Sequence, residues 1–441
     1  MKLYLESLGC AKNLIDSEVM LGRLVEAGCE ITDNPVEANI IVVNTCSFIE
    51  SAVEESIDTI LELAKYKNEG NCGCLIVAGC LPERYREDIV KSLEEVDIFL
   101  GTGAYDRIVA AVESYPDNAD GLYIPDPAMI PLQSRDTPRI PSTPYMAYIK
   151  ISEGCNRRCS YCIIPKLRGR QRSRLPGDIA EEARSMVLAG KKELVLVAQD
   201  TTSYGCDLKP AAGFDKLLKD IAGISENFRL RFLYGHPESI DSKVIETVGS
   251  FDNICSYFDI PVQHAATNVL KKMGRNYSED KLYRLIDSIR QRVPDAALRT
   301  TVIVGFPGET DEDFQKLADF ASRTRFDHLG VFTYSDSEDI PSHRLSGHVP
   351  VNIAEERLDY LMALQRDISF ENNKKHLGKT YSVLVEEGSE DGYYTGRTVF
   401  QAPEVDGVTY INAGSGHIQL GDFIDVMITD TSEYDLTGEQ V

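Results

Sequence analysis

Apolar runs alternate with amphipathic helical patterns over the first 115 residues of the chain. Runs such as KLYLESL, NIIVVNT and CLIVAG each precede a segment with apolar residues at helical spacing, for example AVEESIDTILELAKYK. Strands that alternate with helices form a parallel sheet with helices on its faces. We therefore predict an α/β domain at residues 1–115.

The pattern changes three times after this domain. Residues 116–144 contain seven prolines, too many for a packed element, and are expected to form a linker. In residues 145–375, six apolar strands separated by five crossovers predict a partial (β/α)6 barrel of TIM type, two units short of closure. Short alternating strands between Gly and Asp at residues 376–441 predict a small antiparallel β-barrel of oligonucleotide-binding (OB) type.

Three cysteines lie within eight positions of the run EGCNRRCSYC. This local set, Cys155, Cys159 and Cys162, follows the first barrel strand, and barrel active sites form at strand carboxyl ends. A zinc site needs a fourth Cys or His at short spacing, and none follows before Cys206. Three thiolates can instead hold a 4Fe-4S cluster with one iron open to an outside ligand, which indicates chemistry rather than scaffolding.

The Cys-x3-Cys-x2-Cys spacing, with Tyr161 before the third cysteine, resembles the radical S-adenosylmethionine (SAM) superfamily. The resemblance implies that SAM binds the open iron and that an electron from the cluster cleaves it to a 5′-deoxyadenosyl radical. The run TTVIVGFPGET matches the superfamily's Gly-x-Ile-x-Gly-x-x-Glu pattern at Ile303 and Gly305. Thr301 replaces the first glycine and Glu309 falls one position late, so no role is carried over to that glutamate.

Polar residues follow two other predicted barrel strands. Gln199 and Asp200 end the run KELVLVAQD, and Gln263 and His264 end the run DIPVQH. By position and resemblance, Gln199, Asp200 and Gln263 are expected to contact the cofactor. His264 remains open between a general acid, a cofactor contact and a packing residue.

The stretch from Lys150 to Arg174 has eight basic residues and one acid, Glu153. It could contact ribosomal RNA, bind the cofactor carboxylate, or offset the negative charge of a cluster and its thiolates. We favour the last two roles, with Arg174 as a candidate cofactor residue.

A dispersed set of cysteines occupies equivalent places in the first domain: Cys10 after YLESLG, Cys46 after IIVVNT and Cys80 after LIVAG. Because the carboxyl ends of parallel strands share one edge of a sheet, these thiols can converge. Cys72 and Cys74 precede their strand and are expected at the opposite edge. The pattern predicts a second three-thiolate cluster, again with an open position.

A radical SAM barrel between a three-cysteine domain and a small barrel of the TRAM type resembles the methylthiotransferases over the whole chain. The resemblance implies that the second cluster holds the sulfur that is inserted. It also implies that one SAM methylates this sulfur while another generates the radical that removes hydrogen from the acceptor carbon. Both cysteine sets are then expected to face one cavity.

Two substrate classes are known for this family: adenosine in transfer RNA, and an aspartate of ribosomal protein S-twelve. The runs LGCAKNLIDSE, NTCSFIESAVEESIDTI and GCLPERY resemble the ribosomal-protein branch, although Ala11 stands where that branch has proline. The transfer-RNA branch is expected to carry Gly-Gln-Asn where this chain has Ala198, Gln199 and Asp200. The resemblance implies modification of the aspartate β-carbon, in S-twelve alone or within the small ribosomal subunit, with an electron donor as a further partner.

Charge gives an independent argument about the substrate. Acidic residues outnumber basic ones 70 to 46, for a net charge of -24. From His376 to Val441, twelve acidic residues face only Lys379 and Arg397. An RNA-binding barrel relies on a cationic groove, so this segment suits a basic protein and argues against transfer RNA. The alternative is a merely solvated acidic face.

The remaining features concern the compartment and the class of protein. The first segment carries Glu6 and Lys12 and lacks a signal-peptide core, and no apolar run approaches the roughly 18 residues of a membrane span. Eleven cysteines then point to metal or redox chemistry in a cytoplasmic enzyme without a membrane partner. Two alternatives stay open: a transfer-RNA adenosine methylthiotransferase, and a non-catalytic iron-sulfur carrier.

Overall fold

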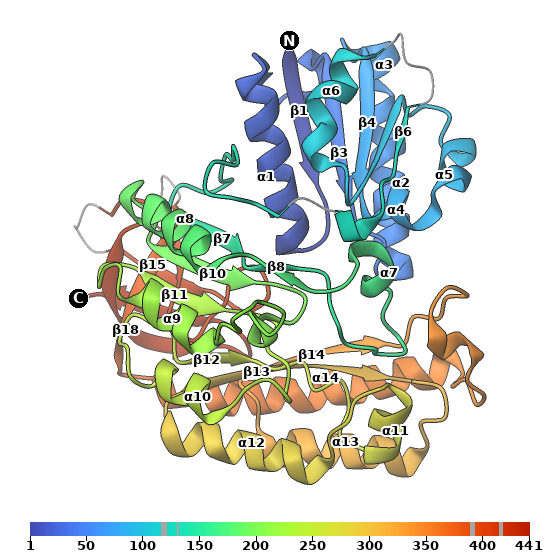
Figure 1. Ribbon diagram of the computed structural model, residues 1–441. Coiled ribbons are helices and arrows are strands. Elements are labelled where there is room, and N and C mark those ends of the chain that lie inside the picture. The colour runs from blue at the N-terminus through green and yellow to red at the C-terminus, as the bar shows by residue number, and fades with distance from the viewer. Residues whose placement is uncertain (116–120, 130–131, 389–392, 414–417) are drawn as a thin grey trace.

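The computed structural model describes residues 1–441 except 116–120, 130–131, 389–392 and 414–417. The N-terminal part is a parallel sheet in the order β2-β1-β3-β4-β5-β6 (Figure 1). Its strands are β1 (Lys2–Ser7), β2 (Glu30–Ile31), β3 (Ile40–Thr45), β4 (Cys74–Gly79), β5 (Ile98–Gly101) and β6 (Leu122–Tyr123). The predicted α/β class is confirmed, and the sheet takes its last strand from within the segment expected to be a linker.

Helices cover both faces of this sheet. Ile40 and Val42 of β3 pack on one side with α1 and α6, while Ile41 and Val43 pack on the other side with α2. All of β3 and β4 is buried, as expected of parallel strands between two helical layers. The helices are α1 (Ala11–Glu26), α2 (Glu50–Ala64), α3 (Tyr66–Glu69), α4 (Cys80–Tyr85), α5 (Glu87–Ser92) and α6 (Ile108–Glu113).

Six parallel strands form the middle of the molecule in two groups of three, β11-β10-β7 and β12-β13-β14. A bridge between Leu230 and Ile254 joins the groups, which gives the predicted open barrel. The strands are β7 (Met146–Lys150), β10 (Glu193–Val197), β11 (Arg229–Phe232), β12 (Tyr257–Asp259), β13 (Ala297–Val304) and β14 (His328–Thr333). The covering helices are α8 (Pro176–Leu188), α9 (Phe214–Ala222), α10 (Ser242–Val248), α11 (Thr267–Lys272), α12 (Glu279–Arg292) and α13 (Asp311–Thr324).

The first helix of the N-terminal part packs on the inner face of the open barrel. Ala11 and Ile15 of α1 are buried in one apolar cluster with Tyr148 of β7, Val195 of β10 and Tyr257 of β12. Because the barrel is not closed by further strands, this apolar face would otherwise meet water. The contact holds the start of α1 against the barrel interior.

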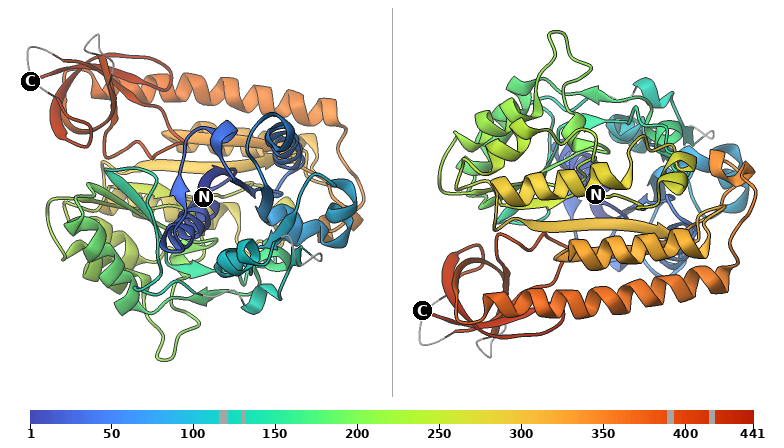
Figure 2. Two further views of the ribbon diagram at one scale, coloured as in Figure 1. Left: turned by 90° about the horizontal axis from the view of Figure 1, so that it is seen from above. Right: turned by 90° about the horizontal axis from the view of Figure 1, so that it is seen from below.

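The C-terminal part is a closed barrel in the order β15-β16-β17-β19-β18. It lies at one end of the long helix α14 (Val351–Asn373), as both views in Figure 2 show. The predicted small barrel is confirmed, with the difference that β17 and β19 pair in parallel. Its strands are β15 (Thr380–Gly388), β16 (Tyr393–Arg397), β17 (Thr409–Asn412), β18 (Phe423–Thr431) and β19 (Leu436–Gln440). Within the described ranges, no helix combines the length and apolar character needed to cross a membrane.

Candidate active site between two cysteine sets

The dispersed set lies along the carboxyl edge of the N-terminal sheet. Cys10 follows β1 as the N-cap of α1, Cys46 follows β3, and Cys80 follows β4 as the first residue of α4. These three strands are neighbours in the sheet, so the structure brings the three thiols to one edge, as the sequence predicts. The backbone at Gly9 approaches Cys46 so closely that a Cβ there would lie 2.7 Å from the Cys46 Cβ.

Two buried cations set the electrostatics of the dispersed set. Burial would raise the pKa of the Cys10 thiol, but Lys12, Arg168 and two backbone N–H groups outweigh it and bring that pKa below its usual value. For Cys80, burial prevails and raises the pKa to about 12. A thiolate is the form that binds iron, so Cys10 is the thiol of this set best prepared for ligation.

Arg168 ties the dispersed set to the local set. It ends α7 (Ile164–Arg168), the helix that follows Cys162. Its Nη2 donates to Asn13 Oδ1 at 2.6 Å, and its Nη1 lies 2.9 Å from Asp16 Oδ2 and 3.2 Å from Glu153 Oε1. Because Glu153 immediately precedes Gly154 and Cys155 in the chain, one buried cation links the two cysteine regions.

The local set lies in the loop between β8 (Ser152–Glu153) and α7. Ser160 of this loop donates its backbone N–H to Met273 O at 3.0 Å, which packs the loop on the end of α11. The backbone N–H of Arg157 points to Cys155 Sγ at 3.3 Å. Burial raises the pKa of the Cys155 thiol to about 11 and that of Cys162 to about 12. Metal binding at this loop must therefore release protons.

Neither set is arranged as a site for a single metal ion. Among the described residues, no group of three or more His, Cys, Asp or Glu side chains is suited to hold one ion. In a 4Fe-4S cluster each thiolate binds a different iron, so the thiols need not converge on one point. The arrangement of the described residues therefore does not match a closed zinc site.

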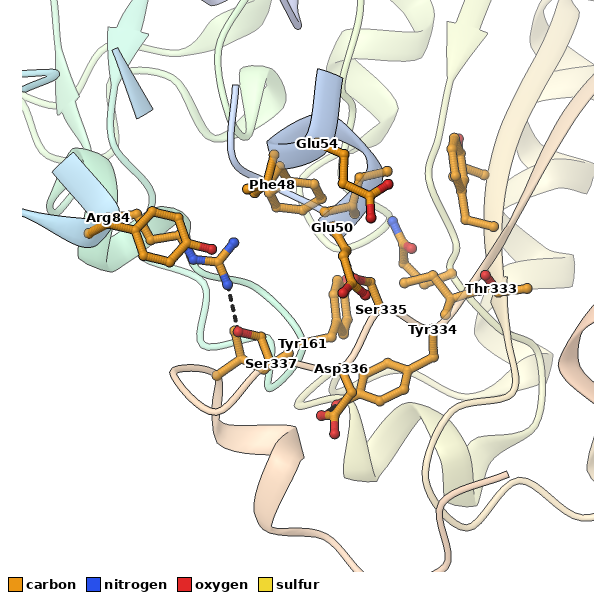
Figure 3. Close-up of a pocket in the computed structure, with 18 residues that line it drawn as sticks. Phe48, Glu50, Glu54, Arg84, Tyr161, Thr333, Tyr334, Ser335, Asp336 and Ser337 are labelled. Atoms are coloured by element: carbon orange, nitrogen blue, oxygen red, sulfur yellow. Dashed lines mark hydrogen bonds between the residues drawn. The ribbon is translucent and has the colours of Figure 1, made fainter. Parts of the chain in front are cut away.

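A cavity of about 390 Å³ lies between the start of α2 and the end of α4 on one side and β13, β14 and the loop after β14 on the other (Figure 3). None of the six candidate cysteines is among the lining residues. Phe48 lies two residues after Cys46, and Tyr161 lies between Cys159 and Cys162, so each set has a chain neighbour in the cavity wall. The lining residues on the N-terminal side are Phe48, Ile49, Glu50, Val53, Glu54, Arg84 and Tyr85. Those on the barrel side are Tyr161, Gln263, Thr301, Ile303, Phe332, Thr333, Tyr334, Ser335, Asp336, Ser337 and Ile340.

Arg84 closes one end of this cavity and was not singled out from the sequence. Its Nη2 lies 2.8 Å from Asp339 Oδ1 and donates to Ser337 Oγ at 2.6 Å, across the boundary between the two parts. The available signal was spacing, because Arg84 lies four residues after Cys80 on the same short helix. The helix that starts with a candidate ligand thus also carries the contact to the barrel.

Three family models match the chain in succession. They are the uncharacterized protein family UPF0004 over residues 2–101, the radical SAM superfamily over residues 149–321, and the TRAM domain over residues 377–441. The middle match contains the local set. The first match contains the dispersed set and ends with β5.

Full-length relatives identify the family. The ribosomal protein uS12 methylthiotransferase RimO of Desulfosudis oleivorans is 52% identical over 439 residues, covering 100% of both chains. The protein of the same name from Clostridioides difficile is 46% identical and covers 100% of this chain and 98% of its own. This chain belongs to the RimO family. It is therefore a methylthiotransferase with a radical SAM domain, which implies a 4Fe-4S cluster and SAM.

A more distant likeness shows the fold alone. The radical SAM methyltransferase TsrM from Kitasatospora setae has a TM-score of 0.60 and 16% identity, covering 80% of this chain and 78% of TsrM. The likeness agrees with an N-terminal parallel sheet ahead of a partial barrel.

Three of the cofactor residues expected of this RimO-family enzyme line the cavity: Tyr161, Gln263 and Ile303. Gln263 has a positive φ of 67° and is bridged to Val302 of β13. Gly305 also has a positive φ, 74°, and a Cβ there would lie 2.5 Å from Ala354 Cβ of α14. Glycine is needed at 305 because the long helix packs directly on that turn.

The other four expected cofactor residues, Gly305, Gln199, Asp200 and Arg174, lie outside the cavity wall. Gln199, at the end of β10, is half-buried, and neither its amide oxygen nor its nitrogen has a partner in the described residues. Asp200 accepts from Arg157 Nε at 2.7 Å, beside Cys155. Arg174 is buried and pairs with Glu182 at 2.6 Å, although its Nε and Nη2 have no hydrogen-bond partner among the residues described.

The late glutamate of the barrel motif has a packing role. Glu309 Oε1 lies 2.8 Å from Arg357 Nη1 of α14, and its other oxygen accepts from the backbone N–H of Phe306 at 3.2 Å. His264 is fully buried and accepts from the backbone N–H of Ala266 at 2.9 Å. Burial lowers the pKa of His264 to about 3, so this ring is neutral and matches the packing alternative.

Proposed function

We propose that this RimO-family enzyme inserts a methylthio group at the β-carbon of an aspartate in ribosomal protein S-twelve. The observation that carries the proposal is a single cavity lined by Phe48, two residues after Cys46, and by Tyr161, between Cys159 and Cys162. Radical formation and sulfur delivery must act on one acceptor carbon, so the two centres need a shared space. The relatives that cover the whole chain are named for the same ribosomal protein, uS12.

We assign the two cysteine sets to two 4Fe-4S clusters. The local set would hold the cluster that binds SAM, and the dispersed set would hold the cluster that carries the sulfur. When bound, these groups supply the radical and the methylthio group. The protein would contribute Tyr161, Gln199, Asp200, Gln263, Ile303, Gly305 and Arg174 as the surroundings of the cofactor.

The domain division follows the same assignment. We propose an N-terminal cluster domain at residues 1–115, a linker at 116–144 that also adds strand β6 to the N-terminal sheet, a radical SAM partial barrel at 145–375 and a TRAM barrel at 376–441. Part of the linker, residues 116–120 and 130–131, lies outside the described residues.

The surface charge of the C-terminal barrel supports a basic protein as substrate. Of its two basic residues, Arg397 is 2% exposed and pairs with Glu193 of β10 at 2.8 Å, so it docks the barrel on the neighbouring strands. Lys379 is exposed and is the other cation of this segment. Such a surface repels phosphates and attracts lysine- and arginine-rich protein segments.

The setting of the reaction completes the proposal. We place the enzyme in the cytoplasm, with an electron donor for the clusters and S-twelve either free or in the small ribosomal subunit. Transfer-RNA adenosine is the alternative acceptor. A non-catalytic iron-sulfur carrier would need neither the cavity nor an open iron.

Anaerobic reconstitution tests these alternatives together. Protein supplied with iron, sulfide, SAM and a reductant should add the mass of a methylthio group in place of one hydrogen to a peptide carrying the S-twelve aspartate. If adenosine in bulk transfer RNA is modified and the peptide is not, the substrate is transfer RNA and the proposed protein substrate is wrong. Absence of any SAM cleavage would favour the carrier.

A further inference from the structure

Two carboxylates at the mouth of the cavity, those of Glu50 and Glu54, form no ion pair with the described residues. Glu50 and Glu54 lie on the first turns of α2, both exposed, and extend toward Tyr334 and Ser335 in Figure 3. Neither forms an ion pair with any residue that the structure describes. Their neighbour Asp336 differs, since its Oδ2 lies 2.9 Å from His343 Nδ1. The mouth thus presents two unneutralised charges.

Exposed aromatic rings adjoin these carboxylates. Phe48 is 44% exposed, Phe332 48% and Tyr85 37%, and all three line the same cavity. A lysine or arginine side chain buries its apolar stem on such surfaces while its charged end meets a carboxylate. The combination of free acids and exposed rings fits a cationic peptide segment and repels a phosphate backbone.

We propose that Glu50 and Glu54 bind basic side chains that flank the acceptor aspartate, and so select the segment of the protein substrate that enters the cavity. The inference rests on the proposed function. The acceptor aspartate is itself negative, so a segment without flanking cations would be repelled from this mouth. The two glutamates therefore act by attraction of a basic segment and by rejection of a neutral or acidic one.

Two synthetic peptides and a matched pair of variants test the inference. Both peptides carry the acceptor aspartate; one has lysines on either side of it and the other has glutamines. The Glu50→Gln/Glu54→Gln variant keeps the shape of the side chains and removes two charges. The control is Glu55→Gln/Glu62→Gln, which removes two exposed charges from the same helix outside the cavity lining.

The measured quantity is the ratio of kcat/KM for the lysine peptide to that for the glutamine peptide. The wild type and the control should share one ratio, and the Glu50→Gln/Glu54→Gln variant should lower it about three- to tenfold, as two partly exposed ion pairs permit. An unchanged ratio overturns the inference and leaves the proposed function standing. Equal loss on both peptides also overturns it, because a purely structural role at the start of α2 would not discriminate between them. Failure of the wild type on both peptides refutes the proposed function, and the inference with it.

Discussion

The two cysteine sets reach comparable sites by different routes. The local set occupies eight consecutive positions in one loop, whereas the dispersed set comes from three strand ends separated by 36 and 34 residues. The first is positioned by a loop packed on α11, the second by a whole parallel sheet. A site of the second kind depends on tertiary packing for its geometry, so it should be the more easily perturbed from a distance.

Removing each set in turn should give the largest contrast. The triple variant Cys10→Ala/Cys46→Ala/Cys80→Ala should lose about half of the iron and sulfide, still cleave SAM, and leave the acceptor unmodified. The triple variant of the local set should lose the other half and all SAM cleavage. Iron analysis and quantification of 5′-deoxyadenosine measure both. Full iron content in either variant would contradict the assignment of two clusters.

The second largest effect is expected from replacing Arg168, the buried cation that links the two cysteine sets. Arg168→Met leaves Asp16 and Glu153 with Lys150 as their remaining buried cation, which should cost about 3–5 kcal/mol in the free energy of unfolding. Iron bound by the dispersed set should fall with it. The control is Arg170→Met, an exposed arginine two positions away. Equal denaturation midpoints for the two variants would show that the ion pairs of Arg168 with Asp16 and Glu153 do not contribute to the stability of the fold.

Alanine substitutions at Gly9 and Gly28 can distinguish the effect of backbone strain from the effect of crowding the cysteines of the dispersed set. Gly9 and Gly28 share a φ of 91°, so alanine at either should cost about 1–2 kcal/mol through the left-handed backbone. Only at Gly9 would the new Cβ overlap Cys46; at Gly28 nothing lies within 4 Å.

Gly9→Ala should therefore lower the iron held by the dispersed set, and Gly28→Ala should not. Iron content of both proteins, each in the background of the local-set triple variant, is the measurement. Equal iron content in the two variants would contradict this prediction. It would mean that the backbone near Gly9 can shift to accommodate the new Cβ without displacing the thiols.

The smallest expected effect concerns the reactivity of the thiols without iron. The pKa of Cys10 lies below its usual value, while those of Cys155 and Cys162 are raised. The fraction of a thiol present as thiolate grows until the pH passes its pKa. At about pH 7.5, Cys10 should therefore be alkylated several times faster than Cys155 or Cys162. As the pH is raised, the alkylation rate of Cys10 should level off at a lower pH than the rates of the other two. Mass spectrometry of iodoacetamide-treated protein, with exposed Cys206 changed to serine, measures this order. Equal rates at neutral pH would show that the nearby cations do not reach Cys10.

Much of the fold and of the candidate site was predictable from local patterns. The six barrel strands are predictable because each is rich in apolar, β-branched or aromatic residues, and the dispersed set because each of its cysteines follows a predicted strand. Local patterns show Arg168 only as one member of a basic stretch, and they do not single out Arg84. Their importance comes from partners far along the chain, Asp16 and Asp339, which no local spacing reveals.

The sequence by itself determined which thiols share an edge, because the direction of parallel strands decides where their carboxyl ends lie. It also determined that the local set has no nearby fourth ligand. Only the tertiary structure decided that Phe48, which follows Cys46, and Tyr161, which lies between Cys159 and Cys162, line one cavity. That arrangement follows from Ala11 and Ile15 of α1 packing inside the open barrel, beside Tyr148. Hydrophobic burial is non-directional, so an apolar pattern shows that a face is covered but not which distant surface covers it.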